Sequence, residues 1–97
     1  MKLELHSSAR RDLDRAAAFY AAEASPVVVA RFFAEYDRVV RFLLERPGAG
    51  SPRSKGRRSF SLDGFPFSVI YREIADGIRV LVVKHDRQRP DFGGSRR

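Results

Sequence analysis

The chain has 97 residues, of which 43% are hydrophobic and 32% are charged, and it contains no cysteine. This composition predicts a single globular domain over residues 1–97 and excludes a disulfide framework or a thiolate metal site. Nineteen Lys and Arg against twelve Asp and Glu give a net charge of +7, which favours acidic partners. The apolar runs are too short to span a bilayer, and the chain opens on a strand-like segment, so we expect a cytoplasmic protein that does not contact a membrane.

The first half of the chain predicts one strand followed by two helices. Residues 2–6 alternate between apolar and polar side chains, as in a short strand. Ser7-Ser8 is expected to cap a helix whose apolar residues recur at three- and four-residue spacing. Ser25-Pro26 signals the start of a second helix, with an apolar stripe over residues 29–44. Arg46-Pro47-Gly48 ends it, which predicts an antiparallel helical hairpin.

The second half predicts a basic loop and then three strands. Residues 48–56 combine Gly, Pro, Ser, Arg and Lys, which predicts a mobile loop without secondary structure. Two strands should follow, over residues 58–62 and 65–71, joined by a turn at Asp63-Gly64. A second turn at Asp76-Gly77 leads to a third strand, over residues 78–85.

The last strand is expected to be central because both of its faces are largely apolar. The opening strand should therefore pair with it. The predicted fold is α+β: an N-terminal strand, an α-helical hairpin and a three-stranded antiparallel meander, with the hairpin covering one face of the sheet.

The chemistry available to the chain is limited. His6 and His85 are its only histidines, and no cluster of His, Asp and Glu has the spacing of a metal site. We expect a structural or solvated role for His6, whereas His85 fits a strand-end hydrogen bond or acid–base chemistry. No cofactor or metal is predicted. The alternative to a binding function is phosphoryl chemistry run by a group of cations, which comprises Arg57, Arg58, Arg72, Arg79, Lys84, Arg87 and Arg89.

Aromatic side chains are more numerous than one helical hairpin can cover. The sequence has eight Phe and three Tyr, and most of them are expected in the core. The aromatic side chains that the core cannot hold predict an exposed apolar groove rimmed by Arg. Such a groove could bind an acidic, amphipathic peptide. The aromatic residues concerned are Phe32, Phe33, Tyr36, Phe60, Phe65, Phe67 and Tyr71.

These segments together resemble the RelE/ParE toxin superfamily of bacterial type II toxin–antitoxin systems, and more closely its ParE-like branch. The resemblance covers nearly the whole chain. It rests on Ala9, Asp12 and Leu13 in the first helix, Ala16 to Tyr20, Phe33, Leu43 to Pro47, Gly64 to Arg72, Val80 to His85 and Arg87 to Phe92. It implies the same fold and a cognate, acidic, ParD-like antitoxin whose disordered C-terminal segment folds onto the toxin.

The resemblance also implies one of two toxic activities. ParE-like members poison DNA gyrase, whereas RelE-like members are ribosome-dependent endoribonucleases that cleave mRNA. The nucleases carry an Arg where this chain has Ser68, and a Tyr near the C-terminus where it has Phe92-Gly93-Gly94. The resemblance therefore favours a non-enzymatic gyrase inhibitor without catalytic residues. The alternatives are a ribonuclease using Arg57, Arg58, Arg79, Arg87 and Arg89, or a non-toxic relic that binds only the antitoxin.

The predicted contact residues fall into two groups. The target-binding group comprises Lys84, His85, Arg87, Arg89 and Phe92, at the end of the last strand and in the tail. The antitoxin-binding group comprises Tyr20, Phe33, Tyr36, Arg58, Arg72 and Arg79. Operator DNA is an indirect partner, reached through the antitoxin complex. Gly93 stands where relatives commonly carry a second aromatic residue, which predicts a less ordered tail.

Overall fold

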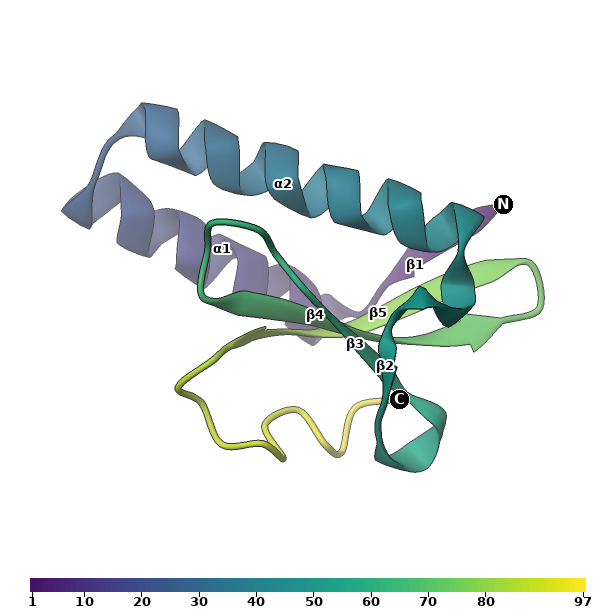
Figure 1. Ribbon diagram of the computed structural model, residues 1–97. Helices are drawn as coiled ribbons and strands as arrows, with labels where there is room; N and C mark the ends of the chain where they lie inside the picture. The colour runs from purple at the N-terminus through teal and green to yellow at the C-terminus, as the bar shows by residue number, and fades with distance from the viewer.

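Two helices lie against one face of a sheet, and the C-terminal tail lies against the other, in a computed structural model that describes residues 1–97 (Figure 1). The helices are α1 (Ser7–Glu23) and α2 (Pro26–Glu45). Neither contains a segment long and apolar enough to cross a membrane. The strands are β1 (Lys2–Leu5), β2 (Ser51–Pro52), β3 (Arg58–Ser61), β4 (Phe67–Ile74) and β5 (Gly77–His85), with short 3-10 turns η1 (Pro47–Ala49) and η2 (Ser54–Gly56).

The sheet has five strands in the order β1-β5-β4-β3-β2. Strand β1 runs parallel to β5 and pairs residues 2–5 with residues 77–80, which confirms the predicted neighbour of the opening strand. The other pairs are antiparallel. The segment 48–56 differs from the prediction, because it contributes β2 and two 3-10 turns. The hydroxyl of Tyr71 accepts a hydrogen bond from Gly50 N–H at 2.9 Å and holds the start of this segment on the sheet.

The helix caps follow the predicted pattern for α2 and differ for α1. Ser25 caps α2 by accepting a hydrogen bond from Val28 N–H at 3.3 Å, and Pro26 occupies the first turn. In α1 the cap is His6, whose Nδ1 accepts from Ser8 N–H at 3.0 Å, and not the predicted serine pair. An unprotonated imidazole nitrogen can accept this hydrogen bond as a serine oxygen does. The structural role expected for His6 is therefore its capping of α1.

The main core lies between the helical hairpin and the sheet. Phe32 is fully buried at its centre, and its ring lies 5.4 Å from those of Phe65 and Phe67. A smaller core lies on the other sheet face, where Phe92 of the tail covers Ile70, Leu81 and Val82. Both faces of β5 are therefore covered, as predicted for a central strand.

A β-bulge in β5 shifts the alternation of its side chains between the two faces of the sheet. Ile70 pairs with Val82 and Tyr71 pairs with Val80, so Leu81 is an extra residue on β5. Val80 and Val83 consequently face the helices, whereas Leu81 and Val82 belong to the core beneath the tail.

Candidate functional site: the end of strand β5 and the tail

A basic turn follows β5, and hydrogen bonds donated by its backbone N–H groups hold it in place. His85 N–H donates to Oε1 of Gln88 at 2.9 Å, and Nδ1 of His85 accepts from Arg87 N–H at 3.0 Å. Asp86 N–H donates to the carbonyl of Pro66 at 2.9 Å. The side chains of Arg87 and Arg89 are exposed beyond this framework. The one ion pair in this turn joins Arg89 to Asp91 at 3.8 Å, and it is weak because both groups are highly exposed. The charges of Arg87 and Arg89 are therefore available to a partner.

An apolar hollow lies beside this turn, between α1 and the end of β5. The hollow has a volume of about 250 Å³. The ring of His85 forms part of its wall and meets the ring of Phe67 edge to face at 5.0 Å. Burial raises the pKa of the Tyr20 hydroxyl above its ordinary value. We define the aromatic hollow as the surface formed by Phe19, Tyr20, Pro66, Phe67 and His85.

Two residues of the predicted target-binding group do not lie on the exposed turn. Lys84 has an exposed fraction of 9%, and its Nζ donates to the carbonyl of His85 at 3.1 Å. Side chains alternate along a strand, so Lys84 lies on the sheet face that the tail covers, opposite to Val83. Phe92 is half-buried over the smaller core, with the guanidinium of Arg96 5.1 Å from its ring. The structure therefore brings together His85, Arg87 and Arg89 on the turn, whereas Lys84 and Phe92 lie on the tail side of the sheet. Contact of Lys84 and Phe92 with a target stays a prediction.

The predicted antitoxin-binding residues are divided between the two sides of the sheet. Tyr20 and Phe33 are half-buried beside the main core. Tyr36 has an exposed fraction of only 6%, and its burial, followed by the charge of Asp37, raises its pKa to about 12. Its hydroxyl has no hydrogen-bond partner. The ring of Tyr36 therefore lies in the core, and its contact with an antitoxin stays a prediction.

The three arginines of that group have separate positions. Arg58 donates to the carbonyl of Gly50 at 2.9 Å and pairs with Tyr71, whose side chain lies in the main core. Arg72 and Arg79 are paired across β4 and β5, and Arg72 lines a cavity beneath the tail. They are therefore separated from Tyr20 and Phe33 by the sheet.

The cations of the ribonuclease alternative are separated in the same way. Arg57 is buried, and its guanidinium donates to the carbonyls of Gly93, Gly94 and Arg96. Arg79 forms an ion pair with Glu4 at 3.3 Å. Arg58 lies toward the helical side, whereas Arg87 and Arg89 are in the exposed turn. The five arginines do not converge on one point.

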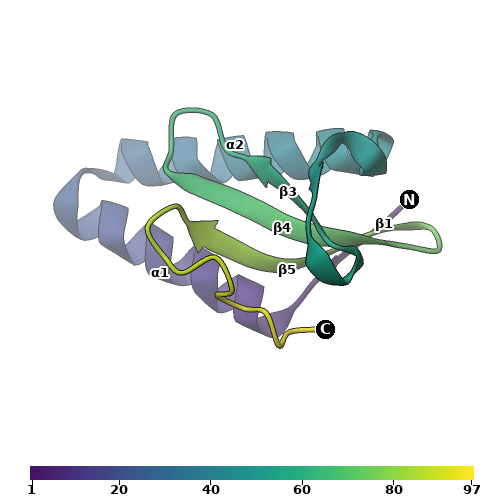
Figure 2. The same cartoon turned by 60° about the horizontal axis from the view of Figure 1, so that its bottom comes forward.

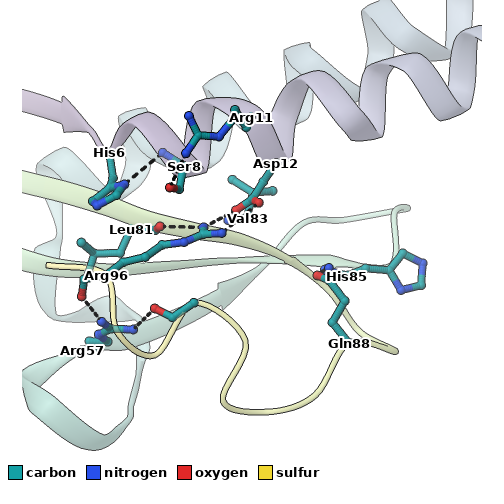
Figure 3. Close-up of polar contacts among 11 residues, drawn as sticks. His6, Ser8, Arg11, Asp12, Arg57, Leu81, Val83, His85, Gln88 and Arg96 are labelled. Atoms are coloured by element: carbon teal, nitrogen blue, oxygen red, sulfur yellow. Dashed lines mark hydrogen bonds and ion pairs between the residues drawn. The ribbon is translucent and has the colours of Figure 1, made fainter.

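Sequence reasoning missed a buried ion pair between α1 and the tail. Figure 3 shows Arg96 extended along β5 with its guanidinium between Asp12 and Leu81. The guanidinium donates to both carboxylate oxygens of Asp12, at 2.5 and 3.3 Å, and to the carbonyl of Leu81 at 3.0 Å. Asp12 also accepts from Val83 N–H at 3.0 Å. Asp12 itself could have indicated this ion pair, because it is an acid on the buried face of a helix, between Ala9 and Ala16. A buried charge of this kind needs a partner.

The tail is held by this pair and by cations of the segment 53–57. Arg53 donates to the carbonyl of Pro90 at 2.6 Å, and Lys55 donates to that of Gly94 at 2.7 Å. Figure 2 shows the tail turning back along β5 toward the start of α1. Gly93 adopts a φ of +74°, and a Cβ there would lie 2.5 Å from a methyl group of Val82. Glycine at this position thus permits close contact, and the tail is more constrained than the sequence predicted.

Comparisons with known proteins agree on one family. The profile of the family described as the ParE toxin of the type II toxin-antitoxin system, parDE, matches residues 3–90. The chain is 30% identical over 91 residues to Toxin ParE2 of Mycobacterium tuberculosis, in strains CDC 1551 and H37Rv, covering 93% of this chain and 86% of that protein. A solved structure of the chromosomal ParDE TA system from P. aeruginosa superimposes with a TM-score of 0.77 at 26% identity. That match covers 88% of this chain and 95% of the other.

Proposed function

Because the chain belongs to the ParE toxin family of type II toxin–antitoxin systems, we propose that it inhibits DNA gyrase in the cytoplasm and that a cognate ParD-like antitoxin neutralises it. The observation that carries the proposal is the exposed pair Arg87 and Arg89 on a hydrogen-bonded turn beside the aromatic hollow. Exposed cations accelerate encounter with an acidic or DNA-loaded target, and apolar contacts then fix the bound position.

The mechanism is binding without bond cleavage. The hydrogen bonds of His85 to Gln88 and Arg87 hold the turn in place before the target arrives, which reduces the entropy lost on association. The imidazole Nδ1 accepts a backbone hydrogen bond, and the ring packs on Phe67. His85 therefore acts as a positioning residue and as part of the contact surface.

The antitoxin is proposed to neutralise the toxin by covering the aromatic hollow. Phe19 is 59% exposed and adjoins Tyr20, with their ring centroids 5.5 Å apart. An apolar side chain of the antitoxin placed in the hollow would contact Tyr20 and His85 together. An antitoxin bound there would block access to the turn that carries Arg87 and Arg89.

A gyrase supercoiling assay with purified toxin tests the target. The wild-type chain should inhibit supercoiling, and the double charge reversal Arg87→Glu/Arg89→Glu should abolish inhibition while the far-ultraviolet circular dichroism stays unchanged. The matched control is Arg31→Glu/Arg41→Glu, which reverses two exposed charges on α2. Supercoiling unaffected by the wild-type toxin would refute gyrase as the target, and a parallel translation assay that maps mRNA cuts would then test the ribonuclease.

Antitoxin binding is tested separately. Phe19→Ser should weaken the affinity for the antitoxin by about tenfold or more, since burying one aromatic side chain contributes about 1.5–3 kcal/mol. The matched control is Val27→Ser, at another exposed apolar residue with an exposed fraction of 66%. Equal affinities for the two variants would place the antitoxin elsewhere.

A further inference from the structure

A second cavity lies on the opposite side of the sheet from the helices, beneath the tail, with a volume of about 550 Å³. We call it the basic cavity, because five of the side chains that line it are cationic and none is acidic. They are Lys55, Arg57, Arg72, Arg96 and Arg97. Neither proposed contact surface, the exposed turn or the aromatic hollow, uses this cavity.

Only one of these five charges is balanced by an acid. Arg96 is paired with Asp12. Lys55 and Arg57 donate to main-chain carbonyls of the tail, which carry partial charges only. Arg72 and Arg97 make no side-chain hydrogen bond or ion pair in the structure. Four cationic side chains therefore meet at one cavity without an acidic side chain to pair with them.

The cost of this arrangement is visible at Arg57. Its pKa is lowered first by burial and then by the positive charges of Arg53, Arg72 and Arg96. Mutual repulsion among these groups would be relieved by an anion that enters the cavity. Guanidinium groups present forked N–H donors, which match the oxygens of a phosphate.

We propose that the basic cavity binds a terminal phosphate or polyphosphate group, with Arg72 and Arg97 as its ligands. Its volume falls in the range of small-ligand sites, about 300–1,000 Å³, and residues 94–97 of the tail form part of its wall. The phosphate belongs either to a free nucleotide or to the 5′ end of a single strand, since both present the same multiply charged group. The inference is independent of the gyrase target.

The test is isothermal titration calorimetry of the purified full-length chain at an ionic strength of about 0.15 M, with inorganic pyrophosphate as the probe. Arg72→Gln should weaken pyrophosphate binding by about tenfold or more, because it removes a charge-assisted hydrogen bond worth about 1.5–3 kcal/mol. The matched control Arg41→Gln removes the same charge from the exposed surface of α2 and should change the affinity by less than about twofold.

A second variant keeps the test valid if Arg72→Gln disturbs the sheet. Arg97→Gln alters an exposed terminal side chain and should also weaken binding by several-fold. No heat of binding with the wild-type chain, or equal losses in Arg72→Gln and Arg41→Gln, would overturn the proposal. Equal losses would mean that pyrophosphate responds only to net charge.

Two further titrations identify the source of the phosphate. Adenosine triphosphate is compared with adenosine, and a 5′-phosphorylated hexanucleotide with its unphosphorylated form. Binding of the triphosphate alone assigns the site to a free nucleotide, whereas binding of the phosphorylated strand assigns it to a strand end. Equal affinity for the phosphorylated and unphosphorylated ligands within both pairs would refute recognition of a terminal phosphate. Because no gyrase is present, a failure here leaves the supercoiling result unaffected.

Discussion

Replacement of Arg96 by alanine should destabilise the fold far more than its position near the chain end suggests. The side chain of Asp12 is 5% exposed and that of Arg96 is 15% exposed, so both charges are removed from most of the solvent. Without Arg96, the carboxylate of Asp12 keeps one protein hydrogen bond, from Val83 N–H. Loss of one partner from a buried pair costs about 3–5 kcal/mol.

The expected loss for Arg96→Ala is at the lower end of this range, about 3 kcal/mol, because the tail can withdraw and admit water to Asp12. For a domain of this size, 1 kcal/mol changes Tm by about 4–8 °C, so Tm should fall by roughly 12–24 °C. Differential scanning calorimetry measures the change. The matched control is Arg97→Ala, which removes the same charge from the adjacent, exposed residue and should lower Tm by only a few degrees.

The double variant Asp12→Ala/Arg96→Ala separates the pair from the individual side chains. It leaves no unpaired charge, so its loss of stability should be smaller than the sum of the two single losses by at least about 1 kcal/mol. If Arg96→Ala and Arg97→Ala unfold at the same temperature, the ion pair does not stabilise the fold and the argument fails.

Three further predictions concern other parts of the fold. Burial, followed by nearby positive charges, lowers the pKa of His6 below its ordinary value, so the folded state binds fewer protons than the unfolded state. Chemical denaturation should therefore show the free energy of unfolding of the wild type falling as the pH drops below about 6.5. The variant His6→Asn should not show this fall. Gly93→Ala should cost at least about 1–2 kcal/mol in urea denaturation because of its positive φ and the adjacent Val82, whereas Gly48→Ala, in open space, should stay within about 0.5 kcal/mol. Hydrogen bonds from Arg38 lower the pKa of Glu35, so the contribution of this carboxylate to the stability of the fold is present above about pH 4.5 and is lost as the pH falls below that value. The drop in Tm on acidification should therefore be smaller in Glu35→Gln than in the wild type.

The sequence predicted the features of the fold that depend on local residues. Alternation placed Phe65, Phe67 and Val69 on one face, and all three contact the main core. Ser25 followed by Pro26 marked the start of α2 correctly, because both act within one turn of the helix. The bulge at Leu81 was not predicted, since a one-residue change of register leaves no signal in a continuous apolar run.

The candidate site was predicted less well because it depends on contacts between distant residues. Arg87 and Arg89 are exposed, as a position in a turn suggested. Lys84 precedes His85 in the sequence, but alternation along β5 places its side chain on the opposite face of the sheet, which the tail covers. The contacts of Arg57 and Arg96 with the tail and with Asp12 span 36 to 84 residues, and spacing along the chain cannot reveal them.

The parallel pairing of β1 with β5 constrains the order in which the protein can fold during synthesis. Strand β1 leaves the ribosome long before its partner residues 77–80. The partner of Asp12, Arg96, is synthesised 84 residues after it. The nascent chain therefore cannot complete its sheet until β5 has emerged from the ribosome, and pairing at such separation forms slowly. The nascent toxin should therefore pass through an interval in which its sheet is incompletely folded.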